Sequence, residues 1–293
     1  MQKKLVAFTA LLFLSLYTIF ANAADNTERD MAERTAEVCR DDIVIEKTKQ
    51  VGAFKITIGR AGDFLCHFVE VKKHGQIVYR DQEIGSHFYF GADADREENP
   101  FRRLQKGGHL NLILSKWTGG AHCCFSVQIF DLENGFSKLA DIDGGTLAPT
   151  FKDIDGDGSL EIEVEDDFLA YRFSSFAFSA IGHVVLKYRN GQYVVAPELM
   201  QKPPISNSTL ARSIPSWRRT LRKIAGAELS PEYPKSFMQA ITDLTFTGNK
   251  NTARELIENV WPKDRPGKIT FVKAYEEALR ESRFYPEFEK QVR

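Results

Sequence analysis

The sequence has few cysteines, little net charge and, beyond its first twenty residues, no long apolar run. Its 293 residues include four cysteines and three tryptophans, and the net charge is −1. The sequence pI of about 6.6 argues against nucleic acid as a partner, because binding to phosphates needs an excess of Lys and Arg. No later segment approaches the roughly 20 apolar residues of a spanning helix. The composition therefore predicts a soluble protein with no transmembrane segment in the mature chain.

The N-terminus has the pattern of a secretory signal peptide. Lys3 and Lys4 precede an apolar run from Leu5 to Phe20, and Ala21 and Ala23 supply small residues at positions −3 and −1 of a cleavage site. The apolar run is shorter than a spanning helix requires. We therefore expect a signal peptide over residues 1–23, cleavage after Ala23, and a periplasmic or secreted mature protein.

The four cysteines are Cys39, Cys66, Cys123 and Cys124. An even number in an exported chain predicts two disulfides, for which three connectivities exist. If Cys123 and Cys124 lie on a strand, their side chains point to opposite faces, which favours separate bridges to Cys39 and Cys66. The alternative is a ring between the two adjacent cysteines. The sequence leaves the connectivity open.

Residues 51–197 have the pattern of β-structure. Apolar and polar residues alternate over Phe54–Ile58, Leu110–Leu114 and Val127–Asp131, and Val184–Tyr188 is a more continuous apolar run. Such segments, rich in β-branched and aromatic residues and separated by glycines, are typical of strands.

Three turn dipeptides recur at nearly equal intervals within this region: His74-Gly75, Asn134-Gly135 and Asn190-Gly191. Each lies between two strand-like runs, and Asn-Gly favours a tight hairpin because both residues tolerate positive φ. The spacing indicates a repeated β-unit, although three units are too few for an ordinary propeller. We expect a sandwich or a partial propeller.

After Ser213 the apolar residues recur with helical spacing. A proline-rich connector, Lys202–Ser208, separates the two patterns. The predicted fold class is therefore α+β, with an antiparallel β-rich N-terminal module over residues 24–205 and a small α-helical bundle over residues 209–293. The first module has an excess of acidic residues and the second an excess of basic ones. Each helix has an apolar stripe, and the four stripes are Trp217, Leu221 and Ile224; Phe237, Ile241 and Leu244; Ala253, Leu256, Ile257, Val260 and Trp261; and Phe271, Tyr275, Ala278 and Leu279.

The segment Asp153-Ile-Asp-Gly-Asp-Gly-Ser-Leu-Glu161 has the strongest chemical pattern in the chain. Asp153, Asp155 and Asp157 place carboxylates at alternate positions, Gly158 allows a sharp turn, and Glu161 closes the set. Ca²⁺ takes six to eight oxygen ligands at about 2.3–2.6 Å, which a curled loop of this kind supplies. The twelfth position, where an EF-hand has its glutamate, is Val164. The segment therefore predicts a shorter calcium loop that leads into a strand.

This loop, followed by a strand inside a repeated β-unit, resembles the FG-GAP/VCBS calcium repeats of integrin-like propellers. The resemblance covers about residues 100–195. It implies that Asp153, Asp155, Asp157, the backbone carbonyl of Ser159, and Glu161 ligate Ca²⁺. The segment Trp117-Thr-Gly-Gly-Ala-His-Cys-Cys-Phe125 is also similar to one in uncharacterised bacterial exported proteins that carry such a loop, and this likeness implies no known activity.

One predicted helix has a strongly basic face. Arg218, Arg219, Arg222 and Lys223 form two like-charge pairs at i, i+4, which are mildly destabilising unless an anion lies nearby. An anionic lipid, a lipopolysaccharide, a polyanionic glycan or the acidic module are candidate partners. The alternative is an ordinary solvated face.

The leading functional hypothesis is an extracytoplasmic, calcium-stabilised binding or interaction protein without catalysis, whose ligand is an unknown protein or glycan of the cell envelope. The alternative is an envelope polysaccharide hydrolase that uses strand-face carboxylates around Glu163 and Asp166. A Cys/His nucleophile at His122 and Cys123 is disfavoured, because neighbours on a strand face opposite ways and a disulfide would consume the thiolate. We expect no organic cofactor and no catalytic residue.

Overall fold

The computed structural model describes residues 42–61, 66–92, 99–120, 123–203, 210–224 and 232–292. The expected signal peptide, its cleavage site, Cys39 and His122 lie outside these residues. The chain forms two compact units, and the division between them falls between Phe88 and Tyr89. The expected module boundary near residues 205–209 therefore falls inside the second unit. In the described part of the chain, no helix is long and apolar enough to cross a membrane.

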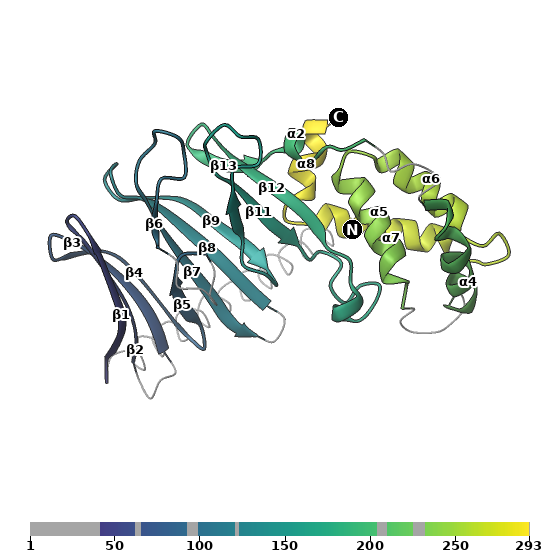
Figure 1. Ribbon diagram of the computed structural model, residues 1–293. Coiled ribbons are helices and arrows are strands. Elements are labelled where there is room, and N and C mark those ends of the chain that lie inside the picture. The colour runs from purple at the N-terminus through teal and green to yellow at the C-terminus, as the bar shows by residue number, and fades with distance from the viewer. Residues whose placement is uncertain are drawn as a thin grey trace, which may run out of the picture. The chain divides into compact units, whose positions relative to one another are not determined.

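The first unit contains a four-stranded antiparallel meander in the order β1-β2-β3-β4 (Figure 1). The side chains of Ile56, Ile58 and Val71 on its central strands are almost fully buried. The turn at His74 and Gly75 has positive φ at both residues, 48° and 82°, as the sequence predicts for this hairpin. The strands are β1 (Val44–Val51), β2 (Phe54–Ala61), β3 (Cys66–Lys73) and β4 (Gln76–Ile84).

The second unit contains two antiparallel sheets (Figure 1). One has the order β5-β7-β8-β9 with β6 paired to β7, and the other has the order β10-β11-β12-β13. The strands of the former are β5 (His87–Phe90), β6 (Phe101–Arg102), β7 (Asn111–Gly120), β8 (Cys123–Asp131) and β9 (Ser137–Gly145). The strands of the latter are β10 (Thr150–Lys152), β11 (Glu161–Asp166), β12 (Gly182–Arg189) and β13 (Gln192–Val195).

The three turn dipeptides each join the last two strands of one sheet. Asn190 and Gly191 form a tight turn with φ of 52° and 92°. The turn at Asn134 differs, because the positive φ angles fall on Gly135 and Phe136. There the Asp131 carboxylate accepts hydrogen bonds from the backbone N–H groups of Glu133 and Asn134, and the loop is longer.

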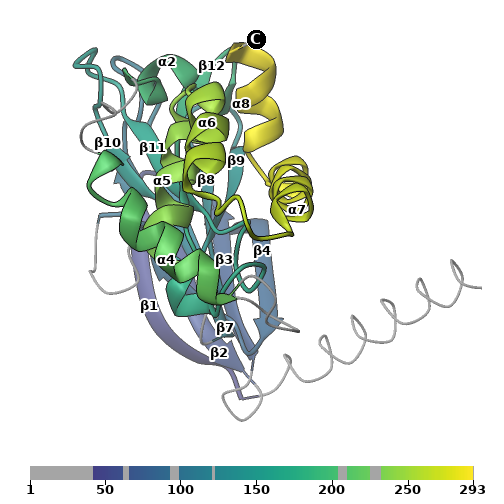
Figure 2. The same ribbon diagram turned by 90° about the vertical axis from the view of Figure 1, so that its right-hand side faces the viewer.

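Helices follow the last sheet, as the α+β prediction requires. A short 3₁₀ turn, η1 (Phe176–Phe178), precedes β12. Figure 2 shows helices α4 to α7 in front of the sheets of the second unit. The four predicted apolar stripes lie in α4 to α7 (with Trp217, Leu221, Phe237, Ile241 and most other members buried), whereas α8 was not predicted. The helices are α2 (Pro197–Met200), α4 (Ile214–Ile224), α5 (Lys235–Phe246), α6 (Lys250–Val260), α7 (Lys268–Glu281) and α8 (Tyr285–Val292).

The helices and the β10–β13 sheet share one hydrophobic core. The ring of Phe246 on α5 packs against Gly182 at the start of β12, where an added Cβ would lie 2.7 Å from the ring. The side-chain amide of Gln239 donates to the carbonyl of Ile181 at 2.8 Å, and its oxygen accepts from the N–H of Ile181 at 3.1 Å. The Asp166 carboxylate at the end of β11 accepts a hydrogen bond from the Ser282 hydroxyl. The helical segment is thus packed onto the strands through contacts along its length.

Candidate metal site

The predicted calcium loop connects β10 to β11, and its backbone turns are formed by its own carboxylates. Asp153 accepts hydrogen bonds from the N–H groups of Gly156 (2.8 Å) and Gly158 (3.1 Å). Both glycines have positive φ, 77° and 88°, which residues with a Cβ rarely adopt. The loop curls because short acidic side chains can bond to backbone N–H groups a few residues ahead, and glycine permits the required angles.

The other acids of the loop are oriented in the same manner. Asp155 accepts from the N–H of Asp157 at 3.2 Å, and Asp157 accepts from the N–H of Ser159 at 2.7 Å. Glu161, the first residue of β11, accepts from the N–H of Ile154 at 2.9 Å across the loop. Each of these bonds uses one carboxylate oxygen, and the second oxygen of each acid faces the Lys187 ammonium.

Three of the five predicted ligands converge. Asp153, Asp155 and Glu161 each present a carboxylate oxygen, and these oxygens lie within 4.8 Å of one another. Two ligands of a single Ca²⁺ ion are separated by at most about 5.2 Å, twice the longest usual Ca–O distance of about 2.6 Å. The three carboxylate oxygens therefore lie close enough together to contact a common metal ion. Asp157 is outside this group, and the hydroxyl of Ser159 accepts a hydrogen bond from the N–H of Lys106 at 3.3 Å.

Sequence reasoning missed the cation that the chain itself brings to the loop. Lys187 on β12 donates from Nζ to Asp155 at 2.5 Å and to Asp157 at 2.7 Å, and lies 3.2 Å from Glu161. The register pairs Ile162 with Leu186, so Glu161 and Lys187 are neighbours across the two strands. The sequence does contain a hint of this contact, a single lysine inside the apolar run 184–188. Only the strand register, however, shows which acids the lysine contacts.

The electrostatics of this cluster are those of an ion pair. The hydrogen bonds to Asp155 and Asp157 raise the pKa of the Lys187 ammonium. The hydrogen bond from Lys187, together with that from the backbone of Ser159, lowers the pKa of Asp157 to about 2. Glu161 is only 1% exposed, whereas Asp157 is 43% exposed. The most buried carboxylate of the loop therefore has an internal counter-ion.

A segment of the preceding sheet holds the loop from outside. The carbonyl of Leu104 accepts from the N–H of Leu160 at 2.7 Å. The side-chain amide of Gln105 donates to the hydroxyl of Tyr193 at 3.0 Å, and burial raises the pKa of that tyrosine. These bonds connect residues 104 and 105 to the C-terminal end of the loop and to β13.

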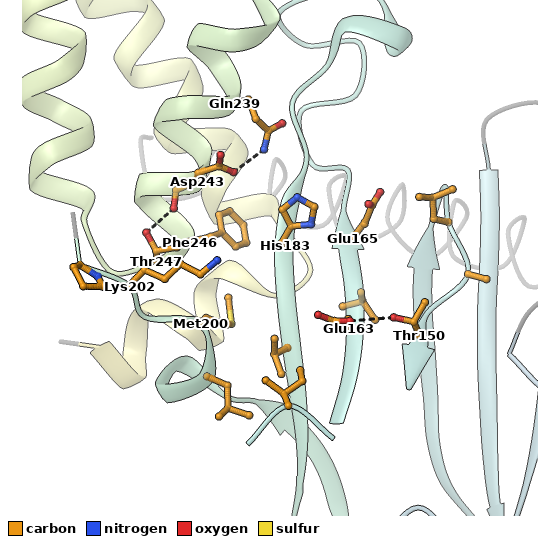
Figure 3. A pocket seen from close by; sticks show the side chains of 17 residues that line it. Thr150, Glu163, Glu165, His183, Met200, Lys202, Gln239, Asp243, Phe246 and Thr247 are labelled. Carbon is orange, nitrogen blue, oxygen red and sulfur yellow. Dashed lines mark hydrogen bonds between the residues drawn. The ribbon is translucent and has the colours of Figure 1, made fainter. Parts of the chain in front are cut away.

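The carboxylates of the alternative hydrolase hypothesis, Glu163 and Asp166, point to opposite faces of β11. Glu163 is exposed and accepts a hydrogen bond from the hydroxyl of Thr150 at 3.3 Å. Asp166 is fully buried against Ser282, and this burial raises the pKa of its carboxyl. This pair therefore does not flank a common substrate position. Glu163 and Glu165 do share a face, and both line a cavity of about 780 Å³ (Figure 3).

The basic residues of α4 lie opposite its buried face, formed by Trp217 and Leu221. Two of the four bases have partners within the chain. Arg218 donates to the carbonyl of Asn259 at 2.5 Å, and Arg222 lies 3.5 Å from the Asp264 carboxylate. Part of the positive charge that suggested an external anion therefore faces the chain's own polar groups, and Arg219 and Lys223 are the remaining candidates.

Comparison with known proteins places the chain in no family. No family model matches it, and no solved structure matches it. The uncharacterized protein y4bJ of Sinorhizobium fredii is 37% identical over 122 residues, which is 41% of this chain and 19% of that protein. The probable thylakoid lumen protein sll0997 of Synechocystis sp. is 34% identical over 106 residues, which is 35% of this chain and 28% of that protein. The chain thus spans less than a third of the length of either relative.

Proposed function

We propose that this chain is an extracytoplasmic binding or interaction protein, without catalysis of its own, whose β-structure is stabilised by Ca²⁺. The observation that carries the proposal is the convergence of Asp153, Asp155 and Glu161 within 4.8 Å. The three side chains would hold the ion, with Asp157 and the carbonyl of Ser159 as further oxygen donors. A bound divalent ion would supply electrostatic cross-linking of β10 to β11, since its ligands come from both ends of the loop.

The location is inferred from two observations. The N-terminal residues have the charged and apolar regions of a signal peptide. A relative is described as a probable thylakoid lumen protein, and a lumen is separated from the cytoplasm by a membrane. We infer a periplasmic or secreted protein. Millimolar calcium is common in such compartments, so even a moderate affinity would keep the loop filled.

Calcium-dependent stability tests the proposal. Binding to the native state alone adds about 2.7 kcal/mol to the free energy of unfolding at a hundredfold excess of Ca²⁺ over Kd. For a unit of this size that gain corresponds to a rise in melting temperature of roughly 5–10 °C. Asp155→Ala should abolish most of the rise. The matched control is Glu277→Ala, an exposed acid on α7, which should keep it. An unchanged melting temperature when chelator is added to the metal-loaded wild type would contradict the proposal.

Hydrolysis of envelope polysaccharide is the second candidate function, because Glu163 and Glu165 line one cavity. Two carboxylates of a glycosidase lie about 5–9.5 Å apart, and residues i and i+2 on a strand can reach such a separation. Reducing-end release from purified envelope glycans by the wild type, and its loss in Glu163→Gln, would establish this function. No release by the wild type would exclude it for those glycans.

A further inference from the structure

The cavity of about 780 Å³ lies between the β10–β13 sheet and the helices α2 and α5 (Figure 3). Its volume is within the range of about 300–1,000 Å³ that is usual for small-molecule sites. Its lining belongs entirely to the second unit. Neither the calcium loop nor the basic helix α4 gives this cavity a ligand, so its ligand must be inferred from its own lining.

One wall of the cavity is acidic. Glu163 and Glu165 alternate on β11 and therefore share a face, and the register sets them opposite Val185 and His183 of β12. The carboxylate of Glu163 accepts one hydrogen bond, from Thr150, and remains exposed. Oε2 of Glu165 is buried and has no hydrogen-bond partner among the described residues. A buried carboxylate oxygen without a partner is unfavourable, so a rotation of the Glu165 side chain that brings this oxygen to an N–H donor in the cavity would lower the energy.

The opposite wall combines apolar side chains with the polar side chains of Gln239, Asp243 and Thr247. Met200 from α2 and Phe246 from α5 line it, and their side chains are only 4% and 2% exposed. Figure 3 shows both on the helix side of the cavity, with Glu163 and Glu165 on the strand side. Val185, half-buried on β12, adds apolar surface between the two walls. A ligand that fills the cavity thus meets two carboxylates on the strand side, and the side chains of Met200 and Phe246 beside that of Asp243 on the helix side.

The charged residues of the lining are predominantly acidic. Glu163, Glu165 and Asp243 contribute negative charge, and Lys202 is the cation of the lining. Oδ1 of Asp243 accepts a hydrogen bond from the amide of Gln239 at 2.7 Å, which fixes its position on α5. The lining therefore has an excess of negative charge that favours a cationic occupant over a neutral or anionic one.

We propose that this cavity binds an organic cation, a primary amine carried on an apolar body, with the ammonium on Glu163 and Glu165 and the hydrocarbon against Met200 and Phe246. The proposal gives a ligand class to the proposed binding function and rests on it. An ammonium carries N–H donors and forms charge-assisted hydrogen bonds with carboxylates, which are about twice as strong as neutral ones.

Three probes with the same hydrocarbon body test the charge preference. Hexylamine, hexanol and hexanoate are titrated into the full-length, calcium-loaded protein at neutral pH, and binding is followed by calorimetry or by ligand-observed NMR. Hexylamine should bind at least tenfold more tightly than hexanol, and hexanoate should bind most weakly. Equal affinity for the three probes, or no binding of hexylamine, would overturn the proposal.

Variants locate the binding. Glu163→Gln combined with Glu165→Gln should weaken hexylamine at least tenfold and leave hexanol unchanged. Its matched control is Glu255→Gln with Glu277→Gln, which removes the same charge from exposed positions on α6 and α7. Val185→Lys is an independent variant that places an ammonium opposite Glu163, and it should block hexylamine. Wild-type affinity in both folded cavity variants would place the amine elsewhere and overturn the proposal.

The outcomes separate this inference from the calcium proposal. If Ca²⁺ stabilises the protein but hexylamine does not bind, the calcium proposal stands and the amine proposal fails. If hexylamine binds but Ca²⁺ does not stabilise the protein, the amine proposal stands and the calcium proposal fails.

Discussion

Lys187 Nζ lies 2.5 Å from the Asp155 carboxylate, inside the loop that the sequence assigns to a metal. The same ammonium contacts Asp157 and Glu161. The acids that would ligate Ca²⁺ are therefore partly neutralised by the protein, and a metal ion would have to compete with a cation fixed to the neighbouring strand. The ammonium also reduces the repulsion among the carboxylates of the loop.

The first prediction is that Lys187→Gln tightens calcium binding. Removing the ammonium abolishes the competition, and for a partly exposed ion pair we expect a gain of about 1 kcal/mol, or roughly fivefold in Kd. Calorimetric titration with CaCl₂ measures the effect. Lys273→Gln, an exposed position on α7, serves as the control and should match the wild type. Equal or weaker calcium binding by Lys187→Gln would show that the lysine supports the site instead of competing with the ion.

The second prediction concerns acid stability in the absence of metal. Lys187 lowers the pKa of Asp157 to about 2, below the usual value near 3.8. Because the folded-state pKa is lowered, the stabilisation from this pair is fully present above about pH 4 and is lost as the pH falls towards 2. Asp157→Asn should therefore be less stable than the wild type at pH 5 and equal to it near pH 2.

Urea denaturation in chelator between pH 2 and 5 measures this difference. Lys187→Gln should remove the same pH dependence, since it removes the other partner of the pair. A constant gap between wild type and Asp157→Asn over the whole range would contradict the prediction, because protonation of Asp157 would then leave the stability unchanged.

The third prediction concerns the contact between the sheet and the helices. A Cβ at Gly182 would lie 2.7 Å from the ring of Phe246, which is 2% exposed, so the ring or the strand would have to shift. Gly182→Ala should therefore destabilise the second unit by about 1–3 kcal/mol, as overpacked cores do. In a double-mutant cycle, Phe246→Leu should relieve part of this cost, because the smaller side chain vacates the position of the ring. Additive costs would place the strain at another neighbour.

The local chemistry of the loop and the secondary structure were readable from the sequence because both depend on short-range patterns. The alternation in Phe54–Ile58 and the turn at Asn190-Gly191 correspond to β2 and the β12–β13 hairpin. The acids of the loop make their turns with backbone groups two to seven residues away, so their spacing alone indicates them. Helix α8 was missed because it is short and only Tyr285 and Phe288 face the core.

Long-range pairing could not be read in this way. Lys187 reaches the loop only because of the register between β11 and β12. The cavity at Glu163 and Glu165 exists only because α2 and α5 pack beside that sheet. The charge difference between the two halves of the chain suggested separate modules. Charged residues, however, mostly lie on the surface, whereas the core that the strands and helices share is formed by apolar residues such as Phe246.

The fourth prediction is that the oxidised protein contains no free thiol. None of the cysteines in the described part of the chain is free, and Cys66 is fully buried on β3. Thiol titration of the denatured, unreduced protein should give essentially zero, and reduction should lower stability by about 2–4 kcal/mol per bridge. Peptide mapping then separates a Cys123–Cys124 ring from bridges to Cys39 and Cys66. One thiol equivalent or more would contradict two disulfides.

The fifth prediction concerns the helical segment 209–293, which the sequence analysis treats as a separate module. In the structure its residues complete the core of the strands: Gln239 pairs with the backbone of Ile181, Ser282 bonds to Asp166, and Gln291 donates to the carbonyl of Val195 at 3.1 Å. Expressed alone, the segment would expose the apolar surface that now covers β12. We therefore expect it to be unfolded or aggregated, as judged by circular dichroism and by the absence of a cooperative thermal transition.

Mixing the fragments completes the test. Residues 24–208 and 209–293, refolded together, should recover the cooperative transition of the second unit, which neither fragment shows alone. Because the contact is largely apolar, the recovery should persist at 1 M salt, where the Debye length is about 3 Å and surface ion pairs are screened. Loss of association at high salt would instead favour docking of the basic α4 face onto the acidic module. A cooperative transition in isolated 209–293 would establish that the helices form an independent domain, because a segment that needs the strands for its core cannot unfold cooperatively without them.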